Sequence, residues 1–205
     1  MAQKSAVSVL TLQQYHARKW DHSSIKDFSN DQFEQHYKLY EGYVKNTNEL
    51  LEKISEFKGE KLTPEISELK RRFGFEFDGM RMHELYFENL ASNTSLSPGS
   101  KFRTVLNEVF GSVESWQRDF AATGEMRGNG WVCLYRDENG NLWNHWIGDH
   151  EIGHLAGCRI LLAMDVWEHA YSVDWEPTER PEYIKAFLRN VAWEICEERL
   201  LTDQA

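Results

Sequence analysis

Apolar and aromatic side chains recur at three- and four-residue steps between Asp31 and Phe57, with polar residues between them. The recurring positions are Phe33, His36, Tyr37, Tyr40, Tyr43, Val44, Leu50, Leu51, Ile54 and Phe57. This spacing predicts one long amphipathic helix, capped by Asn30 or Asp31 and ended by Lys58-Gly59. Residues 1–30 lack a clear period, and we expect them to form an irregular arm.

A second helix is predicted to begin at Thr63-Pro64, because threonine can cap a helix and proline suits the first helical position. Its pattern continues toward Asn89, and we expect an interruption near Gly74 or Gly79. The segment 92–100 is rich in Ser, Asn, Thr, Pro and Gly. It marks the boundary between an all-helical first half and a mixed second half.

The second half combines helical and strand patterns. Two short helices are predicted at 100–110 and 112–122. Strand-like runs at 131–136 and 142–147 flank Asp137-Glu138-Asn139-Gly140, a hairpin turn signal, and 159–164 has the length of a third strand. Arg180-Pro181 then introduces one final helix. Helices followed by a small antiparallel sheet with further helices indicate the α+β class.

Composition narrows the possible environments and partners of the chain. Its 205 residues include 41% hydrophobic and 13% aromatic ones, which is typical of a globular protein. A net charge of -10, with no basic cluster longer than Lys70-Arg71-Arg72, argues against a nucleic-acid partner. Cys133, Cys158 and Cys196 are widely spaced, and we expect reduced thiols of a cytoplasmic protein with no membrane span.

A carboxylate and an imidazole stand four residues apart in Asp165-Val166-Trp167-Glu168-His169, and both can bind one cation. The first two predicted helices offer His36 and His83 as further candidates. Three imidazoles and one carboxylate suit a first-row transition metal and leave room for solvent. Taken singly, each histidine is more often a core or surface residue than a ligand.

The motif DVWEHAY at 165–171 resembles the C-terminal signature of the iron/manganese superoxide dismutases. Five other segments match that family in order: MHELYFENLASN at 82–93, Phe110-Gly111-Ser112, Gly128–Leu134, Arg180–Tyr183 and Asn190–Glu194. The resemblance implies a helical hairpin domain over 1–95 and an α/β domain with a small three-stranded antiparallel sheet over 96–205. Between them, His36, His83, Asp165 and His169 would hold one iron or manganese ion per subunit of a homodimer.

The resemblance also implies an activity and roles for other residues. Superoxide would be disproportionated to dioxygen and hydrogen peroxide by alternate reduction and oxidation of the ion. Tyr43 would be the gateway tyrosine of the substrate channel, and His154 would replace the glutamine that most of the family places beside the metal-bound solvent. The remaining assignments are Trp131 and Trp167 as walls of the pocket, Glu168 as contact to the partner subunit's ligand histidine, and Arg180 as local positive charge.

The chain departs from the family pattern at several positions. His36 and Tyr43 are seven residues apart, whereas the family usually has eight. Because seven residues make about two helical turns, we expect a regular first helix without a π-bulge. Leu39 and Tyr40 stand where the family has paired histidines, and Ser172 replaces a tyrosine. Dimer geometry is therefore open, and Cys133 in place of the usual tryptophan loosens one wall.

Two other functions remain open from the sequence. His150-Glu151-Ile152-Gly153-His154 fits the HExxH motif of zinc proteases, but Gly148 and Gly153 disfavour the helix that this motif requires. A superoxide-dismutase-like fold could also serve as an interaction module without catalysis. Loss of a metal ligand would mark that case, and all four candidate ligands are present.

Overall fold

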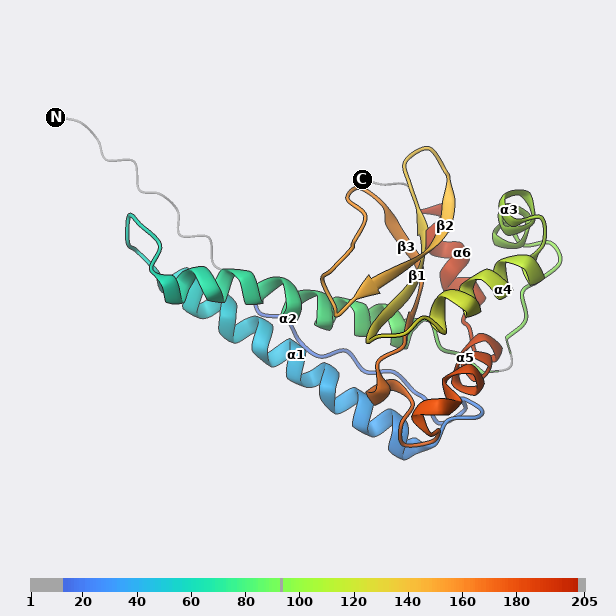
Figure 1. Ribbon diagram of the computed structural model, residues 1–205, viewed down its shortest axis with the longest axis horizontal. Helices are drawn as coiled ribbons and strands as arrows, with labels where there is room; N and C mark the ends of the chain where they lie inside the picture. The colour runs from blue at the N-terminus through green and yellow to red at the C-terminus, as the bar shows by residue number, and fades with distance from the viewer. Residues whose placement is uncertain (1–12, 93, 203–205) are drawn as a thin grey trace.

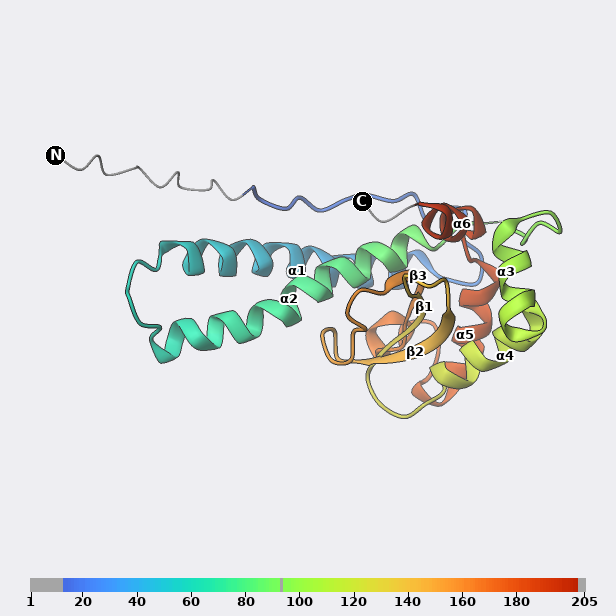
Figure 2. The same ribbon diagram turned by 90° about the horizontal axis from the view of Figure 1, so that it is seen from above.

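The computed structural model describes residues 13–92 and 94–202, and its first half is a helical hairpin. Helices α1 (Asn30–Glu56) and α2 (Pro64–Glu88) run antiparallel and project away from the rest of the molecule (Figures 1 and 2). The cap of α1 is Ser29, one residue before the predicted positions, because its Oγ accepts from the amide of Gln32 at 3.1 Å. This satisfies one of the free amides of the first turn.

Helix α2 begins as predicted but has no interruption. Thr63 caps it and Pro64 is its first residue. The expected break at Gly74 or Gly79 does not occur, since the α-helix continues through both glycines. At Gly79 the missing side chain has a packing role: a Cβ there would lie 2.6 Å from Cδ1 of Tyr43. Close contact with α1, and not a helix end, accounts for this glycine.

The second half contains helices α3 (Lys101–Phe110) and α4 (Val113–Gly124) and the predicted antiparallel sheet. Strands β1 (Gly130–Arg136), β2 (Leu142–Gly148) and β3 (Arg159–Asp165) are arranged in the order β2-β1-β3. The hairpin between β1 and β2 is held by Asp137, whose Oδ1 accepts from the amides of Asn139 and Asn141. The α+β class is confirmed.

The C-terminal region has two helices where one was predicted. Short 3-10 turns η1 (Glu168–Ala170) and η2 (Pro177–Glu179) precede α5 (Arg180–Arg189) and α6 (Trp193–Leu201). The chain is extended between α5 and α6 because its backbone pairs with the end of α2. The amide of Ala192 donates to the carbonyl of Asn89 at 2.7 Å, and the amide of Ala91 donates to the carbonyl of Asn190 at 2.8 Å. Tertiary pairing overrides the continuous helical pattern.

The described part of the arm, residues 13–29, is irregular as predicted and runs along the hairpin (Figure 2). The side chain of Asn48 forms a reciprocal pair of hydrogen bonds with the backbone of Tyr15, at 2.9 Å each. The amide of Arg18 donates to the hydroxyl of the buried Tyr40. Helices of the described residues are too short or too polar to cross a membrane. The C-terminal end of β3 lies against the hairpin, and there the polar site is formed.

Candidate metal centre

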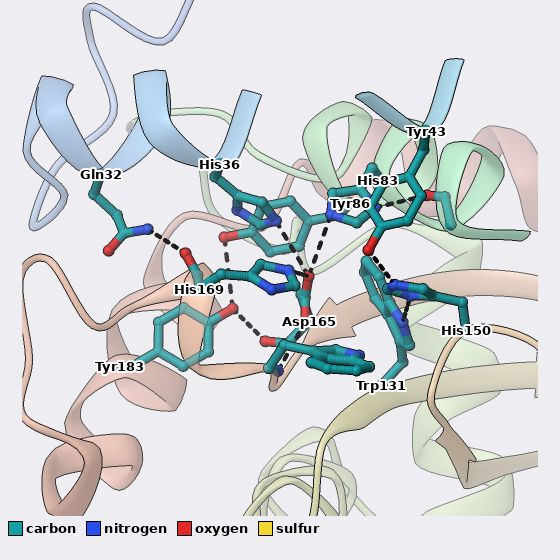
Figure 3. A network of polar contacts seen from close by, with 12 residues as sticks. Gln32, His36, Tyr43, His83, Tyr86, Trp131, His150, Asp165, His169 and Tyr183 are labelled. Carbon is teal, nitrogen blue, oxygen red and sulfur yellow. Dashed lines mark hydrogen bonds and ion pairs between the residues drawn. The ribbon is translucent and has the colours of Figure 1, made fainter. Parts of the chain in front are cut away.

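Four polar side chains from separate elements converge where the hairpin meets the sheet (Figure 3). His36 comes from α1, His83 from α2, Asp165 from the end of β3 and His169 from η1. Their donor atoms all lie within 4.8 Å of one another. The first three are almost fully buried, while the side chain of His169 is 21% exposed. We call this set the four-donor cluster.

Asp165 is the centre of the cluster. Its Oδ2 lies 3.1 Å from Nε2 of both His36 and His169, and 3.7 Å from Nε2 of His83. Its Oδ1 accepts from the amide of Trp167, which fixes the orientation of the carboxylate. Burial alone would raise the pKa of Asp165, but the imidazoles of His169 and His36 lower it below its ordinary value. The carboxylate is therefore ionised.

His83 shows that the cluster fits a cation. Its Nδ1 donates to the carbonyl of Gly79 at 2.6 Å, so Nε2 carries a lone pair. Among the described residues, Nε2 of His83 is a buried atom without a hydrogen-bond partner. Burial lowers the pKa of His83 well below its ordinary value, so the ring is neutral. A neutral imidazole aimed at a carboxylate and two more imidazoles is a donor set for a first-row divalent or trivalent metal.

A second layer of hydrogen bonds lies beside the cluster and joins the hairpin to the sheet part of the fold (Figure 3). The indole Nε1 of Trp131 donates to Nδ1 of His150 at 3.0 Å, and Nε2 of His150 lies 2.7 Å from the hydroxyl of Tyr43. Burial lowers the pKa of His150 to about 4, so the ring is neutral at neutral pH. Because indole can only donate, the proton of His150 resides on Nε2 and is donated to the oxygen of Tyr43.

Comparison with known proteins shows which family combines these features. The family model of the iron/manganese superoxide dismutases, C-terminal domain, matches residues 98–199. A superoxide dismutase [Fe] of Pyrobaculum aerophilum is 32% identical over 80% of both chains. The chain belongs to the iron/manganese superoxide dismutase family.

Two further relatives extend the comparison. A superoxide dismutase [Fe] of Cupriavidus metallidurans is 35% identical over 82% of this chain and 85% of its own. A superoxide dismutase [Mn] of Mycobacterium leprae is 27% identical over 89% of both. The similarity to family members thus extends beyond the matched C-terminal domain and into the helical hairpin.

The geometry departs from the sequence-based hypothesis for the second layer of this superoxide dismutase. His154, and not His150, was expected beside the metal. In the structure, Nδ1 of His154 bonds to the hydroxyl of Tyr135 and Nε2 to the carbonyl of His150, both at 2.8 Å. Both histidines lie in a turn between β2 and β3, where Gly153 has a φ of 105°. The turn points the two rings to different tyrosines, which also breaks the geometry that an HExxH zinc site needs.

The two tryptophans assigned to the pocket flank the cluster. Trp131 is fully buried, and its ring centroid lies 5.1 Å from that of His83. Trp167 stacks on His150 at 5.1 Å and on His169 at 5.6 Å. Cys133 is fully buried on β1, and burial together with the charge of Asp165 raises the pKa of its thiol.

Glu168 and Arg180 have different environments. Glu168 is exposed next to His169, where another chain can reach it. The guanidinium of Arg180 donates to the hydroxyl of Tyr171 and to the carbonyls of Met126 and Gly128. These bonds tie three segments of the fold together and leave Arg180 less free to act on a substrate than the sequence suggested.

Helix α1 is α-helical from Asn30 to Glu56, so the prediction of a regular helix without a π-bulge is confirmed. Two turns separate His36 from Tyr43, and both side chains therefore point to the same junction (Figure 3). The ring centroids of Tyr43 and His83 are 5.1 Å apart.

Sequence reasoning missed two supporting residues. The side-chain Nε2 of Gln32 donates to the carbonyl of His169 at 2.8 Å, and its Oε1 accepts from the backbone amide of Val173 at 3.0 Å. The hydroxyl of Tyr183 donates to the carbonyl of Asp165. Both side chains hold the ligand loop from a distance in sequence. Gln32 lies one helical turn before His36, and this spacing was the one feature of the sequence that could have indicated its supporting role.

Proposed function

We propose that His36, His83, Asp165 and His169 hold the single iron or manganese ion of this superoxide dismutase. The convergence of these four donors, one of them a neutral imidazole nitrogen without a partner, carries the proposal. When bound, the ion supplies one-electron chemistry by alternating between its trivalent and divalent states. We further propose that the cluster lies between two domains, residues 1–95 and 96–205. The presence of all four donors argues against an interaction module without catalysis.

Tyr43 and His150 are suited to deliver a proton in this site. His150 donates its Nε2 proton to the oxygen of Tyr43, so the hydroxyl proton of Tyr43 is free to point toward a substrate. Burial raises the pKa of Tyr43, and the charge of Asp165 adds to this effect. The hydroxyl therefore stays protonated at neutral pH and can donate to a reduced oxygen species. We propose that His150, in place of His154, orients this hydroxyl and tunes the site.

Paired substitutions test the assignment. We expect His150→Ala to lower the rate of superoxide consumption by about 10- to 100-fold, as for other groups that orient a metal site. His154→Ala should stay within about twofold, because its ring bonds to the hydroxyl of Tyr135 and to the backbone carbonyl of His150, and not to the four donors or to the ring of His150. Metal content is measured for both variants. A larger loss in His154→Ala than in His150→Ala would restore the sequence-based hypothesis.

The choice between iron and manganese is open to direct test. The two relatives above that exceed 30% identity are both named for iron, which favours iron as the native ion. We propose to load the metal-free protein with each ion separately and to compare the superoxide consumption of the two forms. Activity of the manganese form alone would refute the preference for iron.

We propose a homodimer formed through the face beside His169. A hollow of about 320 Å³ there is lined by residues that include Lys38, Leu39, His169 and Val173. Leu39 and Val173 are 41% and 40% exposed, which is a high exposure for apolar side chains near a ligand. A second copy would cover them and bring its exposed Glu168 toward His169. This chain has Leu39-Tyr40 and Ser172 where the family has a histidine and a tyrosine that meet at the dimer interface. We propose that other side chains form the contact at this face.

Light scattering tests the dimer. Leu39→Glu should shift the mass toward the monomer, because a charge would be buried in the contact. Val109→Glu is the matched control, since Val109 is 44% exposed on α3. A monomeric parent protein, or equal shifts in both variants, would contradict this face.

We also propose a cytoplasmic location, supported by three free cysteines, two of them fully buried.

A further inference from the structure

Phe75, Arg72 and Glu76 of α2 form a layer on the outer side of the Tyr43–His150 pair. The ring centroid of Phe75 lies 4.6 Å from that of His150 and 6.0 Å from that of Tyr43. On Phe75, the guanidinium carbon of Arg72 lies 3.9 Å from the ring centroid. This distance is that of a cation–π contact. Arg72 is 55% exposed, so a positive charge lies at the solvent side of the layer.

Arg72 is held in this position by Glu76. Nε and an Nη of Arg72 lie 2.8 and 2.7 Å from Oε1 of Glu76, whose other oxygen accepts from Asn46 at 3.1 Å. The side chain of Glu76 is only 5% exposed. The carboxylate faces the protein while the guanidinium faces water. Although the pair is neutral in sum, the charge that an approaching ion meets first is positive.

The surroundings of Arg72 are otherwise unfavourable for an anion. The whole chain has a net charge of -10. On the same side of the site, Glu151 lies against Gly74, and Asp78 lies 3.9 Å from His154. The charge of Arg72 also acts on the two inner groups. Burial has the largest effect, raising the pKa of Tyr43 and lowering that of His150. The positive charge of Arg72 lowers both pKa values. Arg72 therefore lies close enough to act electrostatically on both groups.

We infer that Arg72, stacked on Phe75 and anchored by Glu76, guides the anionic substrate to the Tyr43–His150 side of the centre. The inference rests on the superoxide dismutase function and assigns to Arg72 the positive charge that the sequence had suggested for Arg180. A local cation in a negative protein raises the encounter rate of a small anion, and the gain is screened by salt.

Neighbouring arginines on α2 provide a matched test. Arg72→Gln should lower the second-order rate of superoxide decay about two- to fivefold at an ionic strength of about 0.01 M, and much less at about 0.3 M. Arg71→Gln removes an equal charge one residue away, from an arginine that is 75% exposed and paired with Glu68. It should lower the rate and its salt dependence clearly less than Arg72→Gln does, because the screening length of about 30 Å at this ionic strength still lets a neighbouring charge act, but Arg71 does not stack on Phe75. Arg72→Lys should keep most of the salt dependence.

Anion binding gives a readout besides activity. The Kd of azide for the metal-loaded protein, measured by absorbance, should weaken about two- to fivefold in Arg72→Gln and stay constant in Arg71→Gln. Thermal unfolding and metal content verify that the variants are folded and loaded. Equal effects of the two glutamine variants, or an unchanged salt dependence in Arg72→Gln, would overturn the inference. If the parent protein consumed no superoxide, the function itself would fail, and the azide titration would still decide whether Arg72 attracts anions.

Discussion

Two regions of this molecule bury imidazole nitrogens without a hydrogen-bond partner, and they differ in what surrounds those atoms. Among the described residues, these nitrogens are Nε2 of His83 and both ring nitrogens of His22. His83 faces Asp165, His36 and His169. His22 lies on the arm, where its ring stacks on Phe33 at a centroid distance of 4.4 Å and lies 5.3 Å from Phe87.

The contrast separates a metal site from a packed histidine. Burial of an unpartnered polar atom costs free energy, and each case needs a compensation. At His83 we propose that the compensation is a cation shared with three other donors. At His22 it is contact between flat rings, with no convergence of other donor atoms. A buried imidazole therefore indicates a metal only where other donor atoms converge on the same point.

The strongest test of this contrast is loss of the metal. His83→Ala should lower metal affinity and superoxide consumption by more than about 100-fold, because it removes a ligand where even supporting groups contribute about 10- to 100-fold. His22→Ala removes an equally orphaned ring and should keep both. Metal content by mass spectrometry and superoxide decay measure the outcome. Equal metal loss in the two variants would erase the distinction.

Removal of the ion should affect stability only through the four-donor cluster. A ligand that binds the native state alone stabilises it by about 3–4 kcal/mol when its concentration is about 100 to 1,000 times Kd. We expect a chelator to lower the free energy of unfolding of the parent protein and of His22→Ala by the same amount. His83→Ala should show almost no change. Denaturant unfolding with and without chelator gives the values.

The pH dependence of stability should reveal His22. Burial lowers its pKa from 6.5 to about 4, opposed by Asp21. Between these values the unfolded chain binds more protons than the native one, so stability is complete above pH 6.5 and is lost as the pH falls toward 4. We expect a loss of about 1–2 kcal/mol, because the ring is partly exposed.

Denaturant unfolding across this pH range checks the assignment. His22→Phe keeps the stacking and should reduce the slope, while the contribution of His150, whose pKa is also lowered to about 4, remains. His16→Phe, at an exposed position of the same arm, should not change it. A profile that keeps its slope in His22→Phe would show that other groups cause the loss.

The smallest expected effect concerns the support of His83 and Tyr43 by Gly79. In Gly79→Ala the new Cβ would lie 2.6 Å from the ring of Tyr43 and push it aside. We expect the rate of superoxide consumption to fall about three- to tenfold while the metal is retained. Gly42→Ala on α1 meets no atom within 4 Å and should stabilise the helix by about 0.5–1 kcal/mol. Metal loss in Gly79→Ala would show that His83 moves as well.

Local rules were sufficient for most of the secondary structure. Helix α2 begins at Thr63-Pro64, and the hairpin between β1 and β2 is formed by Asp137–Gly140, both as predicted. The helical period from Asp31 to Phe57 corresponds to α1. The predictions were wrong where distant segments interact. The interruption of α2 at Gly74 or Gly79 is absent because α1 packs into the space at Gly79, and the single C-terminal helix is divided because its middle pairs with Asn89 and Ala91.

The residues that are able to bind a metal can be read from the letters alone, because imidazole and carboxylate side chains are visible there and DVWEHAY is specific. The letters also show that Tyr43 shares a face of α1 with His36, since a helix has a fixed period. Which histidine of HEIGH faces the site follows from the folded chain, because the turn at 149–153 directs the ring of His150 to Tyr43 and that of His154 to Tyr135. A turn has no period to extrapolate, so the direction of a side chain there depends on what it meets.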